Sequence, residues 1–205
     1  MHRRAIRHLR AVDPALGAVI ARVGPYRLVP VSDGTHFDHV VRCIVGQQLS
    51  GKAAATIYQH LLDTYGGRRP TPAELAKTPE ARLRAAGLSG RKTEYVKELA
   101  ERTLRREIAI ERLHELADDE VMETLVRVRG IGRWTAQMVL MFRLGRPDIL
   151  PELDLGVQKA VQRLHRMRKL PTPEKLHRIG AKWAPYRTYA AWYLWRSLEL
   201  VDTES

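Results

Sequence analysis

The stretch VRGIGRWTA, residues 128–136, places two glycines one residue apart between two segments in which apolar residues recur at helical spacing. Gly130 and Gly132 can adopt positive φ, which would allow a tight turn and the close approach of another backbone. Main-chain N–H groups that point outward from such a turn, at the N-terminus of the next helix, can bind an anion. The stretch therefore predicts an anion-binding turn between two helices.

A turn of this kind has two interpretations. One is an ordinary connection between helices, in which glycine serves packing alone. The longer pattern LVRVRGIGRWTA, residues 125–136, favours a helix–hairpin–helix, which holds a DNA phosphate with main-chain amides and does not read base sequence. The residues expected at the phosphate are Arg129, Gly130, Ile131, Gly132, Arg133 and Thr135.

The charge of the chain also favours a polyanionic partner. The formal net charge is +12 and the isoelectric point is about 10.2. Of the 35 basic residues 27 are arginine, whose planar guanidinium suits phosphate. A codon bias toward arginine is the alternative explanation. The basic residues are spread along the whole chain, so a basic tail is not expected.

Composition excludes several other classes of protein. Apolar residues make up 44% of the chain, as in ordinary globular proteins, and the longest apolar runs, such as residues 138–142, are too short to span a bilayer. The N-terminus lacks the apolar stretch of a signal peptide. A single cysteine, Cys43, excludes an intramolecular disulfide and four-cysteine zinc or iron–sulfur sites. We expect a cytoplasmic protein, associated with the nucleoid if bacterial, with no membrane partner.

Helix signals recur along the chain and strand signals do not. Asp13-Pro14 and Ser50 can begin helices, Thr71-Pro72-Ala73-Glu74 fits a capping box, and Thr78-Pro79 and Thr172-Pro173 are further helix openings. The expected helices cover residues 14–23, 37–45, 51–65, 92–104, 119–126, 133–142, 155–165 and 186–201. Residues 26–31 read as extended, but Pro30 disfavours an interior strand. The fold class is therefore all-α.

Downstream of the hairpin, LPELDLGVQ, residues 150–158, places Asp154 where a helix should begin. An N-cap is the commonest role for such an aspartate. Hairpin and aspartate together, with the blocks at 44–54 and 183–195, resemble the helix–hairpin–helix DNA glycosylases, and within them the 3-methyladenine DNA glycosylase II subfamily. The resemblance covers roughly residues 35–200.

The resemblance implies a two-lobed helical fold with the active-site cleft between the lobes, in a single glycosylase unit over residues 1–205. The approximate lobes are residues 35–145, with the hairpin at 125–136, and residues 1–34 plus 146–205, with Asp154. Because only a short segment precedes the helical core, we expect a compact form without the N-terminal α/β domain of the well-known bacterial relative.

The resemblance also assigns the chemistry: a monofunctional glycosylase that flips alkylated bases, of the 3-methyladenine and 7-methylguanine type, out of double-stranded DNA and hydrolyses the N-glycosidic bond. Asp154 would be the essential carboxylate, stabilising the oxocarbenium-like sugar or activating water. Glu152 is the rival carboxylate, although the register of the block favours Asp154. Gln48 would plug the emptied duplex, with Leu49 as second candidate. The alternative for Gln47 and Gln48 is that they cap helix ends.

Trp134 occupies the position at which strand-cleaving relatives carry a lysine that forms a Schiff base. The hairpin has no lysine, so no lyase activity is expected. An indole there could instead form one wall of a pocket for a cationic alkylated base, with Trp195 as the second wall. Tyr186 and Tyr189 are further candidates for this pocket, although aromatic residues at helical spacing more often pack in the core. Trp183 is assigned to the core.

No cofactor is expected, because the C-terminal cysteines that hold an iron–sulfur cluster in some relatives are missing. The resemblance implies at most a monovalent cation on the carbonyls of Val126, Val128 and Ile131 when DNA is bound. A monomer is expected. Two weaker patterns are set aside: Ser89-x-x-Lys92 resembles a helix opening more than an acyl-transfer motif, and His36 and His39 lack a third metal ligand.

Three alternatives stay open on the sequence. A non-catalytic helix–hairpin–helix module that senses lesions would explain the charge and the hairpin, but not the register of Asp154. A glycosylase for an oxidised or deaminated base, or for a mismatched pyrimidine, would keep the chemistry and change the pocket. A bifunctional lyase is the third, and it would form a covalent adduct with DNA that borohydride traps.

Overall fold

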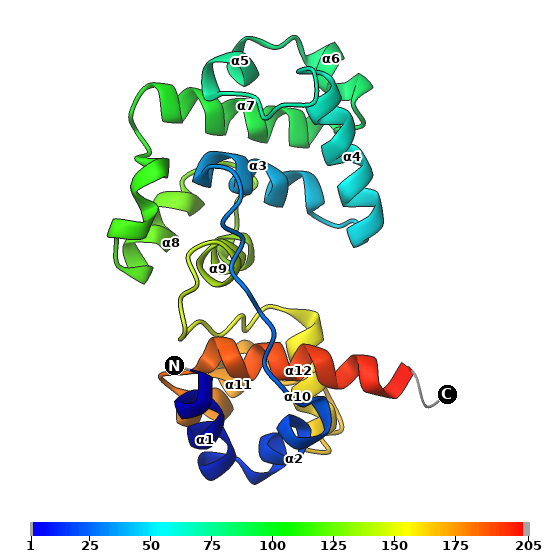
Figure 1. Cartoon of the computed structure of the whole chain (residues 1–205), viewed down its shortest axis with the longest axis vertical. Helices are drawn as coiled ribbons and strands as arrows, with labels where there is room; N and C mark the ends of the chain where they lie inside the picture. The colour runs from blue at the N-terminus through cyan, green and yellow to red at the C-terminus, as the bar shows by residue number, and fades with distance from the viewer. Residues whose placement is uncertain (1, 203–205) are drawn as a thin grey trace. The chain divides into compact units, whose positions relative to one another are not determined.

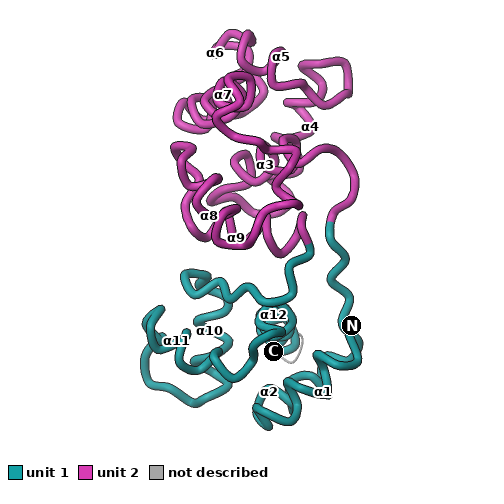
Figure 2. Tube along the Cα trace, turned by 90° about the vertical axis from the view of Figure 1, so that its left-hand side faces the viewer, with its two compact units in different colours: residues 1–30, 145–205 teal, residues 31–144 magenta. Residues whose placement is uncertain are grey.

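The computed structural model describes residues 2–202, which form helices and no strands (Figure 1). The all-α prediction is confirmed. The chain divides into two compact units, unit 1 from Met1–Pro30 with Gly145–Ser205 and unit 2 from Val31–Leu144 (Figure 2). Unit 2 is therefore inserted into the sequence of unit 1. None of the helices within residues 2–202 has the length and apolar character needed to cross a membrane.

Unit 2 is built around two helices that are buried on most sides. Its elements are α3 (His36–Gly46), α4 (Gly51–Asp63), α5 (Pro72–Lys77), α6 (Glu80–Ala85), α7 (Gly90–Leu104), the 3-10 helix η1 (Ile110–Glu115), α8 (Asp118–Val126) and α9 (Arg133–Phe142). Helix α3 packs against α4, α7, α9 and η1. Seven of the ten residues of α9 are buried, which places this helix in the core next to α3.

Unit 1 is formed by two segments of the chain, one before unit 2 and one after it. It contains α1 (His2–Val12), α2 (Pro14–Val23), α10 (Leu155–Leu164), α11 (Pro173–Gly180), the 3-10 helix η2 (Ala181–Trp183) and α12 (Arg187–Asp202). Helix α12 packs against both α2 and α10. The core of unit 1 includes fully buried Leu9, Leu16, Val157 and Leu176.

A buried aspartate ties the two segments of unit 1 together. Asp13 is 1% exposed and caps α2 by accepting a hydrogen bond from the Leu16 N–H at 3.1 Å. Its second oxygen accepts a bond from Trp183 Nε1 at 2.9 Å and lies 3.1 Å from Lys182 Nζ. The assignment of Trp183 to the core is confirmed, since its side chain is fully buried.

The helix-start signals are mostly confirmed. Asp13, Ser50 and Thr172 cap α2, α4 and α11 with their side chains, and Thr71 and Glu74 form the complete capping box of α5. Ser89 likewise caps α7, so the Ser89-x-x-Lys92 pattern is a helix opening.

Two expectations need correction. The Thr78-Pro79 pair precedes a helix, but Thr78 donates its hydroxyl back to the Glu74 carbonyl and ends α5, so α6 begins at Glu80 without a side-chain cap. Helix α1 was not expected: its first turn is basic and has no acidic residue to mark a helix start. It forms because Ala5 and Leu9, one turn apart, are fully buried in unit 1.

Candidate functional site

The predicted phosphate-binding turn lies between α8 and α9 in unit 2. Val128 and Ile131 are buried, and the Ile131 N–H donates to the Val128 carbonyl at 3.1 Å, which closes the turn. Gly130 lies between them at φ +80°, a conformation that residues with side chains rarely adopt. A Cβ at Gly130 would lie 2.0 Å from the Tyr95 ring of α7. The glycine therefore allows both the turn and its close packing on α7.

Gly132 does not have the positive φ expected for it. Its φ is −88° and ψ is 174°, it is the N-cap residue of α9, and a Cβ there would meet open space. As a glycine, this N-cap residue has no side chain of its own to cap α9. The N-terminus of a helix favours an anion, and the open space beside Gly132 allows one to approach.

The polar residues of the predicted phosphate site differ in their surroundings. The Arg129 guanidinium forms an ion pair with Glu98 of α7, and this carboxylate raises the pKa of Arg129. Burial raises the pKa of Glu98, but its bonds from Arg129 and Arg102 outweigh burial and leave the pKa lowered. Thr135 is buried, and its hydroxyl accepts a bond from Gln47 Nε2 at 3.2 Å. Its hydroxyl is thus engaged inside unit 2, whereas Arg133 is exposed.

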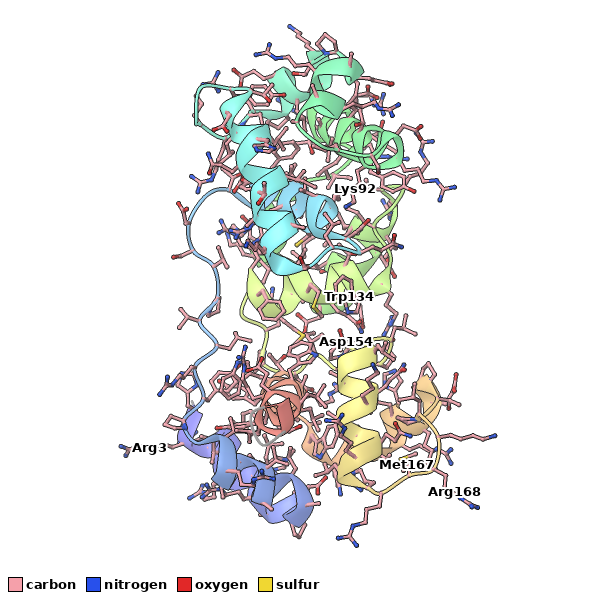
Figure 3. All side chains as sticks on the ribbon, turned by 90° about the vertical axis from the view of Figure 1, so that its right-hand side faces the viewer. Arg3, Lys92, Trp134, Asp154, Met167 and Arg168 are labelled. Atoms are coloured by element: carbon pink, nitrogen blue, oxygen red, sulfur yellow. The ribbon has the colours of Figure 1, made fainter. Side chains whose placement is uncertain are left out.

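The predicted wedge lies in the turn between α3 and α4. Gln48 has φ +59° and is exposed, and Leu49 beside it is 38% exposed. Two residues not predicted as functional support this turn. Gln47 donates from Nε2 to the Gly130 carbonyl at 2.7 Å. Lys92, labelled in Figure 3, lies on α7 and donates from Nζ to the carbonyls of Val45 and Gln47 at 2.7 and 2.8 Å.

The candidate catalytic residue Asp154 lies at the N-terminus of α10 in unit 1 (Figure 3). Its Oδ1 accepts a hydrogen bond from the Val157 N–H at 2.8 Å, which makes it the N-cap of that helix. The same oxygen accepts a second bond from the indole Nε1 of Trp195 at 2.8 Å. A Cβ on Gly156 would lie 3.0 Å from both Asp154 Oδ1 and Trp195 Cδ1, a closer approach than side chains usually make, so a glycine favours this arrangement. The carboxylate is oriented by groups from α10 and α12.

The rival carboxylate, Glu152, is placed differently. Its side chain is 4% exposed, with His177 Nε2 of α11 at 3.8 Å. Its carbonyl accepts a bond from Gln158 Nε2 at 2.8 Å. These contacts are those of a residue that joins the loop before α10 to neighbouring helices.

The predicted base-pocket aromatics fall into two groups. Trp134, the second residue of α9, is 38% exposed, and Trp195 on α12 is half-buried beside Asp154. Tyr189 is 5% exposed and stacks on Tyr26 at 4.3 Å between ring centroids, and Tyr186 meets Tyr189 edge-on. The tyrosines therefore form a packing cluster in unit 1, as aromatic residues at helical spacing commonly do.

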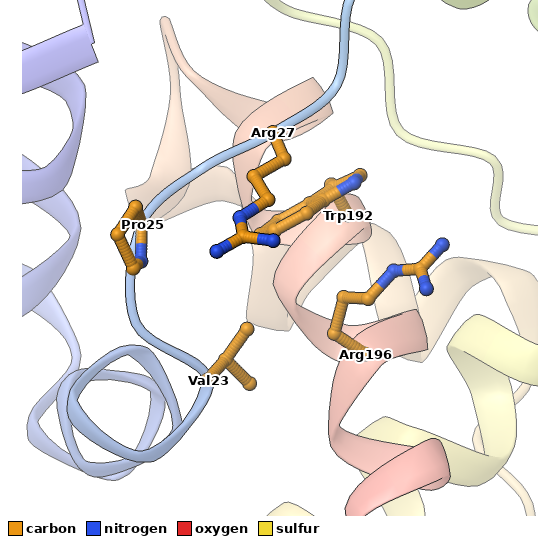
Figure 4. A pocket seen from close by; sticks show the side chains of 5 residues that line it. All are labelled: Val23, Pro25, Arg27, Trp192 and Arg196. Carbon is orange, nitrogen blue, oxygen red and sulfur yellow. The ribbon is translucent and has the colours of Figure 1, made fainter.

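A separate pocket of about 430 Å³ opens beside α12 in unit 1 (Figure 4). Val23, Pro25, Arg27, Trp192 and Arg196 line it, and the Arg196 guanidinium lies 5.7 Å from the centre of the Trp192 ring. Arg196 also pairs with Glu199 at 2.6 Å. None of the predicted site residues lines this pocket.

No group of three or more His, Cys, Asp or Glu residues within residues 2–202 could hold a metal ion. Val128 uses its carbonyl in the hydrogen bond that closes the turn, but a carbonyl has two lone pairs and can accept a second partner. The predicted monovalent cation is compatible with this arrangement and stays a prediction.

Comparison with known proteins identifies the class. Residues 41–186 match the sequence model of the HhH-GPD superfamily of base excision DNA repair proteins. The chain belongs to this family. Among curated proteins it is 35% identical over 198 residues to DNA-3-methyladenine glycosylase 1 of Schizosaccharomyces pombe, a match that covers 95% of this chain and 87% of the relative.

Solved structures agree with this assignment. The structure of the Schizosaccharomyces pombe 3-methyladenine DNA glycosylase Mag1 in complex with abasic DNA superposes with a TM-score of 0.87 at 35% identity, covering 97% of this chain and 98% of that one. A DNA-3-methyladenine glycosidase from Bacillus halodurans superposes with a TM-score of 0.84 at 34% identity, covering 98% and 91%. Both the family and the fold implied by the sequence patterns are confirmed.

Proposed function

We propose that this protein is a monofunctional DNA glycosylase that removes alkylated bases, of the 3-methyladenine and 7-methylguanine type, from double-stranded DNA in base excision repair. The observation that carries the proposal is Asp154, a carboxylate fixed by two hydrogen bonds at a helix start in a chain of the HhH-GPD family. The relatives named as 3-methyladenine glycosylases support the choice of lesion.

The reaction replaces the bond between C1′ of the sugar and the base nitrogen with a bond from C1′ to water. The electron pair of the broken bond leaves with the base, and positive charge develops on the sugar. The Asp154 carboxylate stabilises that charge and orients the attacking water, whose proton is released after attack. Because Oδ1 accepts both fixed donors, the carboxylate needs little reorganisation during the reaction.

The lesion itself supplies part of the driving force. A 3-methyladenine or 7-methylguanine base carries positive charge and leaves as a neutral molecule, so strong acid catalysis is not required. An indole face attracts such a cationic ring. Trp195, half-buried beside Asp154, is the indole that we propose for it. The role expected of Trp134, exposed at the start of α9, stays a prediction.

Strand cleavage is not part of the proposed activity. A lyase needs an amine that attacks C1′ and forms a Schiff base. In this chain Trp134 occupies the hairpin position of that lysine, and residues 125–136 contain none. The product is therefore an intact strand with an abasic site.

The partner is duplex DNA, held at the α8–α9 hairpin through main-chain amides and exposed basic side chains such as Arg133. We propose that one copy of the chain acts alone. A monovalent cation on the carbonyls of Val126, Val128 and Ile131 would add positive charge near the bound phosphate. A duplex complex with only water at those carbonyls would remove the cation from the proposal.

The test is base release from a panel of duplexes that each contain one defined lesion. Release of 3-methyladenine or 7-methylguanine with an uncut strand is the expected result. Release only of an oxidised or deaminated base, or of a mismatched pyrimidine, would move the proposal to another lesion class. Binding to abasic DNA with no release from any duplex would favour a lesion-sensing module. A covalent adduct trapped by borohydride would contradict the monofunctional assignment.

A further inference from the structure

The turn that carries Gln48 and Leu49 is bonded to two other parts of unit 2. From α7, the Lys92 ammonium donates to the carbonyls of Val45 and Gln47 at 2.7 and 2.8 Å. From the turn itself, Gln47 Nε2 donates to the Gly130 carbonyl at 2.7 Å and to the Thr135 hydroxyl at 3.2 Å. The turn is thus bonded on one side to α7 and on the other to the hairpin.

Physical reasons make the lysine bonds important at this position. The last carbonyls of a helix have no partner within the helix, and a cation favours the negative end of the helix dipole. Helix α3 ends at Gly46, so Val45 and Gln47 are such carbonyls. Burial lowers the pKa of Lys92, which fits an ammonium enclosed by protein groups.

The backbone of the turn needs this support. Gln48 has φ +59°, a left-handed conformation that a residue with a side chain rarely adopts. The Leu49 N–H donates to the Gly46 carbonyl at 3.2 Å, and few other main-chain bonds hold the tip. This conformation leaves the Gln48 and Leu49 side chains exposed.

We propose that Lys92 and Gln47 are positioning residues that hold the tip of the α3–α4 turn ready to enter the duplex, at a fixed offset from the phosphate-binding hairpin. The proposal rests on the proposed function and on the prediction from the sequence that Gln48 fills the gap that the flipped nucleotide leaves. The bonds from Gln47 to Gly130 and Thr135 link the tip to the hairpin. A phosphate held at the hairpin then sets where the tip meets the base stack.

The chain supplies a matched control for Lys92. Lys97 lies on the same helix, is half-buried to a similar degree, and donates from Nζ to the carbonyls of Ala76 and Thr78 at 2.9 and 2.7 Å. Its bonds hold the connection between α5 and α6 and do not touch the hairpin or the tip. Lys92→Met and Lys97→Met therefore remove the same kind of interaction from the same helix, and only the first loosens the tip.

The first measurement does not require catalysis. A duplex carries a tetrahydrofuran abasic analogue opposite 2-aminopurine, whose fluorescence changes when a side chain fills the gap beside it. At saturating protein, K92M and Q47A should lose at least half of the wild-type fluorescence change, as Q48A should, whereas K97M keeps it. Circular dichroism at the assay temperature shows that each variant is folded, and Q47A replaces K92M if that variant is not.

The second measurement is base release in two contexts. From a fully paired lesion duplex, K92M should be at least about tenfold slower than wild type, and K97M within about twofold. When the lesion faces an abasic nucleotide, less stacking must be broken to flip the lesion out. The rate of base release by K92M should then be less than about threefold below that of the wild type. Equal behaviour of K92M and K97M in both assays would overturn the proposal. Wild-type protein that releases no alkylated base would instead count against the proposed function, while the fluorescence assay still tests the tip.

Discussion

At the scale of single residues, Asp154 combines two roles in one side chain. Its Oδ1 caps α10 and accepts the indole N–H of Trp195, so the proposed reactive group is also part of the helix start. The aspartate could be noticed in the sequence as an N-cap, but only the resemblance to a family gave it a catalytic role. The bond to Trp195 joins residues 41 positions apart, and no local pattern predicts it.

This dual role decides which substitution tests the chemistry. Asp154→Asn keeps an oxygen that can accept both bonds, and asparagine caps helices as well as aspartate does, but the negative charge is lost. We expect base release to fall by at least about a thousandfold, a loss of about 4 kcal/mol of transition-state stabilisation. Single-turnover release measures the loss, and affinity for abasic DNA should change by less than about threefold. Glu152→Gln is the matched control, and near-normal release by a folded D154N would remove Asp154 from the proposal.

Trp195 offers a second test at this scale. Trp195→Phe keeps an aromatic ring for the proposed pocket but removes the N–H donor to Asp154. A hydrogen bond to a charged group contributes about 1.5–3 kcal/mol, so we expect release to slow by about 10- to 100-fold. Trp192→Phe removes an indole from the same helix without touching Asp154 and should change the rate by less than about twofold. Equal rates for the two variants would show that the Trp195 N–H has no part in the reaction.

At the scale of elements, the hairpin shows how two glycines of one motif differ. Gly130 has φ +80° and packs on Tyr95, whereas Gly132 has an ordinary φ and faces open space. The sequence predicted the turn and both flanking helices, because apolar spacing and glycine mark them directly. It did not separate the two glycines, because the difference comes from a tyrosine on another helix.

The two glycines form a natural pair for mutation. Gly130→Ala puts a Cβ into a left-handed backbone and against the Tyr95 ring, and we expect a loss of about 2–5 kcal/mol in the free energy of unfolding. Gly132→Ala has open space and needs no change of φ, so the loss should stay below about 1 kcal/mol. Urea denaturation gives both values. Comparable losses would mean that Tyr95 moves away easily and that Gly130 is not required for packing.

The other elements also divide into local contacts, which the sequence predicts, and contacts between distant segments, which it does not. Caps such as Ser50, Thr71 and Thr172 could be predicted, because a capping side chain and the N–H it accepts lie within one helical turn. Thr78 shows the limit: its hydroxyl had two possible partners, and bonding back to Glu74 ended one helix instead of beginning another. The sequence marks Lys92 only through the Ser89-x-x-Lys92 pattern. Its contacts in the structure are with carbonyls more than 40 positions away, which no local pattern predicts.

At the scale of the whole molecule, unit 1 depends on contacts between the two ends of the chain. Asp13 makes one of them, since it is buried and bonded to Trp183, which lies 170 positions away. No sequence pattern predicts this pairing. Burial raises the pKa of Asp13, but the bonds from Trp183 and Leu16 and the nearby Lys182 ammonium outweigh it and hold the pKa below its usual value.

Asp13→Ala should destabilise the protein by about 2–4 kcal/mol, the sum of a lost helix cap and a buried indole N–H left without a partner. The lowered pKa also fixes a pH dependence. The stabilisation from ionised Asp13 is complete above its unfolded pKa, about 3.9, and is lost as the pH falls through the lower folded value. Thermal unfolding of D13N below about pH 4 should therefore depend less on pH than that of the wild type. Parallel curves for the two proteins would contradict this assignment.

The insertion of unit 2 into unit 1 has a consequence for synthesis on the ribosome. Residues 31–144 leave the exit tunnel as one continuous block and can complete their own core as soon as α9 has emerged. Helices α1 and α2 precede this block and α12 follows it, so the faces of α1 and α2 that pack on α12 stay uncovered until α12 has been made. Residues 2–23 are thus synthesised before unit 2 and buried after it, and a chaperone that shields them would act while the inserted unit folds.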